Sequence, residues 1–354
     1  FFRAIEAQPE DDTPRLVYAD WLDEHAASDV DRARADLIRV QCWREREPPG
    51  ERRVALAGRE GGLLVLYGRE WVKPLPGDLN DALTDFRRGF LDPVTLPAAG
   101  FASHAKHLSE QAPLFHVRLV RARDAMKAIA ARPELSFVRR LTLAGAWVQN
   151  AELTALAPAP HLDNLQQLDL SHNQIGIRGA TDLATARAPA LRELRLERNP
   201  IKDRGLLALA QADWPALEHL DATECGLRFA PAGLADGPLV RRLVSLQLSR
   251  NPDVPASAWL RLAAAPWGRL ERLDLSNPTV TDAVAEALAA NPALAGLRVL
   301  HLGAATITAR GARAILASPY LRGLTRLRLP DDHLDPALRA QLRAVYGAGL
   351  NPRS

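Results

Sequence analysis

The clearest pattern in the chain is a six-residue segment in which leucine alternates with polar residues. LQQLDL, LRELRL and LERLDL are examples, and they end at residues 170, 196 and 275. Such alternation predicts a β-strand with one buried face. The fourth residues of the eight segments lie at 141, 168, 194, 220, 246, 273, 300 and 327. Because the spacing is 26 or 27 residues throughout, the pattern predicts an array of stacked repeats.

A turn and a helix are predicted after each strand. The turn position, three residues past the last leucine, holds Asn173, Asn199, Cys225 and Asn251 in four repeats and Pro278 and Ala305 in two others. Asparagine there can satisfy backbone groups that are freed where the strand bends. Stretches such as GLLALAQA from Gly205 and AVAEALAA from Ala283 then place an apolar stripe on a helix. Stacked units of this kind form a parallel sheet on the concave side and helices on the convex side.

These motifs resemble the leucine-rich repeat family, in the longer variant that is similar to ribonuclease-inhibitor-like repeats. The match covers about residues 135–345, and the weaker strand pairs Val94/Leu96 and Val117/Leu119 extend it to about residue 90 as capping units. The fold class expected is an α/β leucine-rich-repeat solenoid preceded by a small all-α domain. The resemblance implies protein recognition through the concave face.

The first 45 residues have a different, helical pattern. Thr13 can cap a helix with Pro14 at its first position, and a further helix, RARADLIRVQCW, follows Asp31. The segments DDTPRL, YADWL and IRVQ resemble the bacterial repeat-companion domain, which commonly precedes leucine-rich repeats in large-genome environmental bacteria. That family has no assigned biochemical activity, so the resemblance bears on architecture alone.

Acidic residues gather in this segment. Asp20, Asp23 and Glu24 lie on one side of the second helix at spacings of three and four. Together with Asp11, Asp12 and His25, they could form a metal or acid–base cluster, or a surface that contacts a partner. We favour a structural interpretation, in which the acids stabilise the helix dipole and one of them pairs with Arg15 one turn away.

Domain boundaries follow from these patterns. REREPPGERR predicts a linker, and RVALAGREGGLLVLYGREWV predicts an interrupted helix. We expect a helical domain over 1–45, a linker and helical connector over 46–89, the solenoid over 90–345 and a tail over 346–354.

Composition narrows the possible functions. No stretch of the 354 residues approaches the roughly 18 uncharged apolar residues needed to cross a bilayer. Cys42 and Cys225 are too few for a disulfide framework or a four-cysteine zinc site, and we expect buried free thiols in a reducing cytoplasm. Net charge is +3, with 12 acidic and 7 basic residues in the first 50. Neither this part nor the rest has the concentrated basic face of a duplex binder, so nucleic acid is disfavoured.

The sequence also lacks the common catalytic motifs. It contains no phosphate-binding Gly-rich loop with Lys, zinc-protease His pair, calcium loop or nucleophile elbow. His104 and His107 share a helix face, but no further ligand lies at metal-binding spacing beside them. We therefore expect no cofactor, no metal and no enzymatic activity.

The concave face is where a partner is expected. The residues between each pair of strand leucines point away from the core and form a polar row, because parallel strands lie about 4.8 Å apart. Together with a flanking row two residues earlier, they supply the predicted partner-binding residues Arg140, Asp169, Arg195, Asp221, Gln247, Arg272, Asp274, His301, Arg326 and Arg328. The C-terminal end is rich in arginine, which is favoured at interaction hot spots.

Two structural expectations accompany this surface. Asp169, Arg195 and Asp221 alternate in sign, so they could instead form a ladder of charge pairs worth a few tenths to about 1 kcal/mol each. Trp147, just past the first clear strand, is expected to be buried in a cap.

The sequence therefore predicts a non-enzymatic, cytoplasmic and monomeric scaffold that binds an unidentified protein. Nucleic-acid or phospho-ligand binding at the arginine-rich end is one alternative. A structural, self-assembling array is another.

Overall fold

The computed structural model describes residues 1–72, 85–330 and 334–346, and the chain divides into two compact units, Phe1–Thr142 and Leu143–Ser354. Part of the predicted connector and nearly all of the predicted tail lie outside the described residues. None of the described helices is long and apolar enough to cross a membrane.

The first unit begins with a group of helices. They are α1 (Phe2–Ala7), α2 (Thr13–Glu24), α3 (Asp29–Arg46) and α4 (Glu51–Val72). Asp12, and not Thr13, is the N-cap of α2, so the expected cap is wrong by one residue. Ser28 caps α3 in a reciprocal capping box with Asp31. The predicted interruption is absent from α4, which is continuous, and REREPPGERR forms a loop only between α3 and α4.

Three parallel strands complete the first unit. They are β3 (Val94–Pro97), β4 (His116–Val120) and β5 (Arg140–Thr142), with α5 (Ala98–Gln111), α6 (Met126–Ala130) and the 3-10 turn η2 (Pro133–Phe137) between them. The weaker strand pairs seen in the sequence are thus confirmed. A short antiparallel hairpin, β1 (Phe86–Arg87) and β2 (Phe90–Leu91), precedes them.

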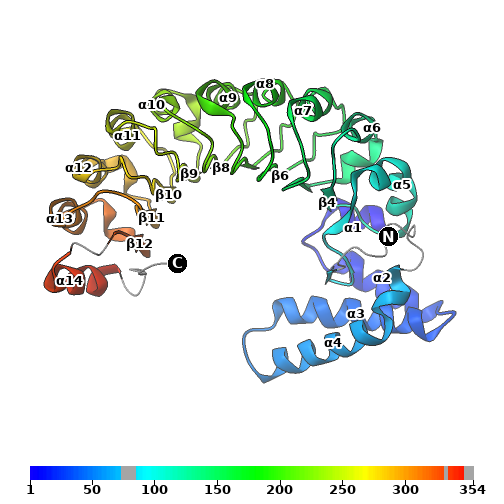
Figure 1. Cartoon of the computed structure of the whole chain (residues 1–354). Helices are drawn as coiled ribbons and strands as arrows, with labels where there is room; N and C mark the ends of the chain where they lie inside the picture. The colour runs from blue at the N-terminus through cyan, green and yellow to red at the C-terminus, as the bar shows by residue number, and fades with distance from the viewer. Residues whose placement is uncertain (73–84, 331–333, 347–354) are drawn as a thin grey trace. The chain divides into compact units, whose positions relative to one another are not determined.

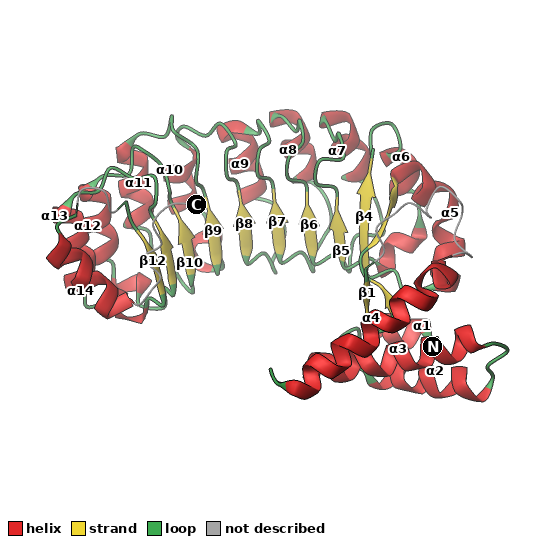
Figure 2. Ribbon diagram, turned by 60° about the horizontal axis from the view of Figure 1, so that its bottom comes forward, coloured by secondary structure: helices red, strands yellow, loops and turns green. Residues whose placement is uncertain are grey.

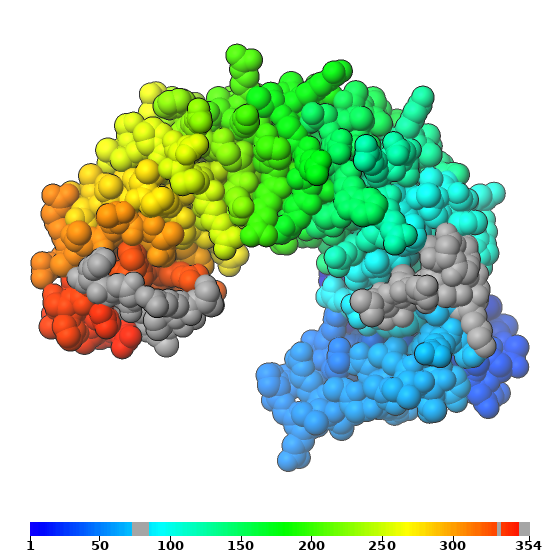
Figure 3. Space-filling model, in the orientation of Figure 1, coloured from blue at the N-terminus to red at the C-terminus, as the bar shows by residue number. Residues whose placement is uncertain are grey.

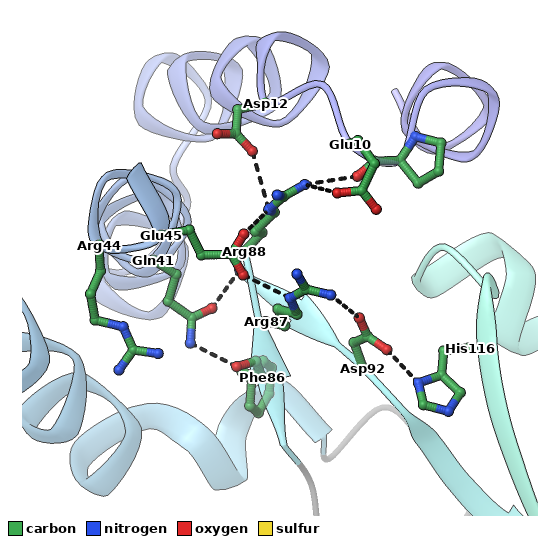
Figure 4. A network of polar contacts seen from close by, with 12 residues as sticks. Glu10, Asp12, Gln41, Arg44, Glu45, Phe86, Arg87, Arg88, Asp92 and His116 are labelled. Atoms are coloured by element: carbon green, nitrogen blue, oxygen red, sulfur yellow. Dashed lines mark hydrogen bonds and ion pairs between the residues drawn. The ribbon is translucent and has the colours of Figure 1, made fainter. Parts of the chain in front are cut away.

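A polar network fixes this hairpin to the helices (Figure 4). Gln41 on α3 donates to the carbonyl of Phe86 at 2.8 Å and accepts from the N–H of Gly89 at 2.6 Å. Arg87 and Arg88 both pair with Glu45, and Arg88 also faces buried Asp12 at 3.5 Å. Burial alone would raise the pKa of Glu45, but the hydrogen bonds from Arg87 and Arg88 outweigh it and hold the pKa below its usual value.

The second unit is a curved solenoid with strands on its inner side and helices on its outer side (Figures 1 and 2). The strands are β6 (Gln167–Asp169), β7 (Glu193–Arg195), β8 (His219–Asp221), β9 (Ser245–Gln247), β10 (Arg272–Asp274), β11 (Val299–His301) and β12 (Arg326–Arg328). Each is parallel to the next, with equivalent residues in register. The predicted strands are therefore confirmed.

The helices of this unit follow the expected order. They are α7 (Asn150–Leu156), α8 (Ile177–Leu183), α9 (Lys202–Ala210), α10 (Ala230–Ala235), α11 (Ala256–Ala263), α12 (Asp282–Ala290), α13 (Ala309–Ala317) and α14 (Pro336–Tyr346). Short 3-10 turns, η3 (Pro238–Arg241), η4 (Pro292–Leu294) and η5 (Leu321–Gly323), lead into the last strands. The central strand leucines, such as Leu194 and Leu246, are fully buried, and each contributes roughly 1.5–3 kcal/mol by leaving water.

Buried amides join one repeat to the next. Asn199 donates to the carbonyls of Leu170 and Leu196, and accepts from the N–H of Ile175 at 3.0 Å. Cys225 takes this place in the next repeat, where its Sγ lies 3.2 Å from the carbonyl of Leu196. Both cysteines are buried free thiols, as expected.

The turn differs from expectation after β10. Asn277, one residue before the predicted Pro278 position, is fully buried and takes the asparagine role. Its amide donates to the carbonyl of Leu248 and accepts from the N–H of Asn251. The need to satisfy these buried backbone groups thus shifts the register of the turn by one residue.

Side chains from one repeat also cap helices of the next. Asp203 at the start of α9 accepts the backbone N–H groups of Arg228, Phe229 and Ala230 at 2.8–2.9 Å, at the start of α10. Asn150 does the same for α8, and Asp282 for α13. These groups satisfy N–H donors that a helix start leaves unpaired.

Candidate functional site

The strands of the second unit line its concave face (Figure 2), and two residues of each strand point outward from the core and form two rows. The first and third residues of each strand are partly or fully exposed in most repeats, and the second is buried. In the space-filling view, the inner side of this unit is hollowed (Figure 3). Nine of the ten predicted site residues lie on these rows.

The aspartates of the central row are engaged by their own strand ends. In each case one carboxylate oxygen accepts the backbone N–H two residues later, at 2.9 Å: Asp169 from Ser171, Asp221 from Thr223 and Asp274 from Ser276. This local turn terminates the strand. The aspartates therefore have a structural role in addition to any contact with a partner.

The charge ladder is present, but on a different row. Arg195 pairs with Glu193 on its own strand, and the neighbouring aspartates face their own turns. Instead, Glu224 pairs with Arg198 at 2.9 Å and Arg250 at 3.5 Å, just beyond the strand ends. The pattern missed it because these residues have positive φ, so the turn and not the strand directs their side chains.

Two arginines at the C-terminal end of the concave face, unlike the charged residues described above, lack a partner for their guanidinium groups among the described residues. Arg272 and Arg326 are exposed. In the described part of the chain, neither has a hydrogen bond or ion pair through its guanidinium. His301 lies 3.6 Å from Asp274, and the side chain of Arg328 lies against Gly303. Strands β10 and β12 therefore present two cations that form no ion pair with any residue that the structure describes.

Asp221 and Asp274 occupy equivalent positions, yet their pKa values shift in opposite directions. Burial raises the pKa of Asp221, and the charge of Glu197 adds to this against the hydrogen bonds from Thr223. Burial acts on Asp274 too, but His301 and the Ser276 bonds outweigh it, so the pKa of Asp274 is lowered.

These shifts predict opposite effects of an Asp→Asn substitution. Ionised Asp274 stabilises the fold above its unfolded pKa, and that stability is lost as pH falls through the lower folded pKa. Asp274→Asn should therefore reduce the free energy of unfolding near neutral pH by about 1 kcal/mol. Asp221→Asn should leave it unchanged or raise it, because the ionised form of Asp221 is disfavoured in the fold. Urea unfolding of both variants from neutral pH down to about pH 4 checks this, and equal losses would contradict it.

Arg140, the tenth predicted residue, belongs to the first unit. Its guanidinium pairs with buried Asp92 at 3.1 Å, and Asp92 also contacts His116 Nδ1 at 2.8 Å. His116 Nε2 lies 3.5 Å from the hydroxyl of Thr142. This Asp–His–Thr order resembles a hydrolase relay, but 3.5 Å exceeds the usual distance for direct proton transfer and Arg140 shares the carboxylate. We assign the network to anchoring the starts of β3, β4 and β5.

Two of the three acidic residues of α2 are paired. Asp20 and Asp23 each contact Arg39 at 2.6 Å. Arg15 is buried and donates to the backbone carbonyl of Asp11. The expected ion pair between Arg15 and an acidic side chain is therefore wrong, because the partner is a backbone group. Within residues 1–72, 85–330 and 334–346, no group of three or more His, Cys, Asp or Glu side chains is arranged to hold a metal ion.

Trp147 corrects another expectation. Its side chain is 61% exposed, and its φ of 64° places it in a left-handed turn. Leucines and not this tryptophan fill the interior of the first repeats of the second unit, as the burial of Leu143 and Leu153 shows.

The comparison with protein-family models supports the repeat assignment. The family model for the leucine rich repeat matches residues 161–184 and 189–210. An internalin from Listeria monocytogenes aligns at 13% identity over 72% of this chain and 68% of its own, with a TM-score of 0.41. A chain of the yeast Rad7–Elc1 complex aligns at 15% identity over 71% and 81%, with a TM-score of 0.36. Scores this low support no inference about partners. No curated protein sequence matches the chain.

The resemblance of residues 1–45 to the repeat-companion domain stays a prediction. The matched family model, the strand–turn–helix units and the buried asparagines between repeats identify the chain as a leucine-rich repeat protein.

Proposed function

We propose that this protein is a non-enzymatic scaffold that holds a protein partner on the concave face of its repeats. The observation that carries the proposal is the exposure of Arg272 and Arg326 without a guanidinium partner among the described residues. Both lie on regular strands, so a partner would meet a preformed surface and little conformational entropy would be lost on binding. We further propose that it acts in the cytoplasm as a monomer.

A pull-down from lysate of the source cells tests this function. The parent chain is compared with an Arg272→Glu, Arg326→Glu, Arg328→Glu variant of matched thermal stability. The control is an Arg178→Glu, Arg261→Glu, Arg313→Glu variant, which makes the same charge change on helices α8, α11 and α13. We expect a protein captured by the parent and the control and lost by the concave variant. Equal capture by all three would place the contact elsewhere.

A nucleic-acid or phospho-ligand is the second candidate, because the unpaired cations are arginines, which bind phosphate in a bidentate manner. A steep loss of affinity with salt would favour it. Self-association is the third candidate, and a mass in solution that rises with concentration would favour it.

A further inference from the structure

The repeats of the second unit change in charge along the array. Residues 143–236 contain 8 basic and 12 acidic side chains. Residues 237–330 contain 12 arginines, no lysine and only 5 acidic side chains. The small net charge of the whole chain hides this division, which places a positive field over the second half of the solenoid.

Much of the excess lies on one side of the solenoid, which we name the arginine face. Its residues are on strands β10 and β12 or in the segments that lead into β9–β12: Arg241, Arg242, Arg269, Arg272, Arg298, Arg322, Arg326 and Arg328. Arg242 and Arg298 donate to the backbone carbonyls of Trp214 and Gly323. A carbonyl fixes the guanidinium but leaves its charge uncompensated.

Acidic side chains offset only part of this charge. Arg269 pairs with Glu218 at 2.7 Å, and Glu218 also contacts Arg192. Arg241 and Arg322 are exposed and, within the described ranges, have no ion pair. The face therefore has cations held in place by the backbone and further cations free to reach a ligand.

The register of the strands sets a spacing for that ligand. Arg272, Val299 and Arg326 are direct neighbours across β10, β11 and β12. The two arginine positions are thus separated by two strand spacings, or about 10 Å. A segment in an extended polyproline-type conformation covers this distance in about three residues and presents the first and fourth on one side, while its second and third side chains point obliquely to either side of that line. Val299, half-buried between the arginines, offers an apolar contact in the middle.

We propose that the arginine face binds an acidic, extended protein segment in which two carboxylates about three residues apart flank an apolar residue. The inference rests on the proposed function and names the chemistry of its partner. The carboxylates pair with Arg272 and Arg326, and the apolar residue packs on Val299. The remaining arginines of the face steer the segment and hold its flanking acids.

A single-stranded nucleic acid fits these rows less well. Proteins that bind single strands stack bases on aromatic side chains along the groove. The outward rows of β6–β12, all within the described residues, hold no Phe, Tyr or Trp. Asp274 also lies on the same strand as Arg272, two residues further on, where it would repel a continuous phosphate backbone but tolerate a segment with spaced charges.

Fluorescence anisotropy with a labelled peptide tests the inference. The probe repeats Glu-Leu-Ala-Glu, and the control peptides are its Gln-for-Glu version and a version with adjacent glutamates. We expect saturable binding of the probe to the full chain that weakens about tenfold or more with Arg272→Glu, Arg326→Glu. Val299→Ser should weaken it about threefold to tenfold, and Arg261→Glu on α11 should change it less than about twofold.

The outcomes separate the inference from the proposed function. Binding no tighter than that of the Gln version overturns the inference, as does tighter binding of labelled oligothymidylate that is lost in the same variant. If the lysate partner is lost by the concave variant while no acidic peptide binds, the proposed function stands and this partner chemistry falls. If the acidic peptide binds the parent but the lysate partner is captured equally by the variant, the proposed function falls.

Discussion

Replacing Asn251 by alanine should lower the free energy of unfolding of the second unit by about 3 kcal/mol or more. The amide is fully buried. Its nitrogen donates to the carbonyls of Ala222 and Leu248 at 3.0 Å, and its oxygen accepts the N–H groups of Cys225 and Leu227 at 3.0 and 3.1 Å. Alanine leaves these backbone groups without a partner, and each unsatisfied buried group costs about 1–3 kcal/mol.

Urea unfolding followed by circular dichroism measures this loss. Ser257→Ala is the matched control, because Ser257 is exposed on α11 in the same repeat and its replacement should change stability by less than about 0.5 kcal/mol. A loss below about 1 kcal/mol for Asn251→Ala would mean that water replaces the amide and that the ladder does not join the repeats.

Gly89→Ala should destabilise the first unit by about 3 kcal/mol or more. Gly89 has a φ of 84° in the β1–β2 hairpin, and a Cβ there would lie 2.1 Å from Ile38 Cγ1 and 2.9 Å from Ile38 Cα. Ile38 is fully buried on α3, so neither the side chain nor the helix backbone can move away cheaply. The substitution would also disturb the hydrogen bond from the Gly89 N–H to Gln41.

The same chemical change on α4 should have the opposite sign. Gly61 lies inside this helix with nothing within 4 Å of the position a Cβ would take. Gly61→Ala should therefore stabilise the unit by about 1 kcal/mol, because alanine has the higher helix propensity. Thermal unfolding of the Gly89→Ala and Gly61→Ala variants, each compared with the unsubstituted protein, checks both expectations. A neutral or stabilising effect of Gly89→Ala would show that the close contact at Gly89 does not exist in solution, and a loss of stability for Gly61→Ala would contradict the expectation for α4.

These expectations bear on function because rigidity is what a scaffold supplies. The buried asparagines and the side-chain caps from neighbouring repeats hold the strands in register. That register places Arg272, Val299 and Arg326 side by side. A variant that weakens the ladder at Asn251 should therefore also weaken partner binding, without touching a contact residue.

The sequence by itself determined the repeat architecture. Leucines at a period of 26 or 27 residues can bury themselves only by stacking identical strand–helix units, so local patterning and tertiary packing demand the same structure. The strand positions and the approximate helices could be predicted for this reason. The outward rows also followed from the sequence, because side chains alternate along a strand.

Only the tertiary structure decided which charges are available. Asp169 and Asp274 bind their own turns, and the charge ladder runs through Arg198, Glu224 and Arg250, where the turn conformation sets the side-chain direction. The tertiary structure also decided that Asn277, and not the residue at the predicted position 278, fills the turn after β10, and that Trp147 is exposed. In each case a backbone group that had to be satisfied, or a residue with positive φ, overrode the period of the repeat.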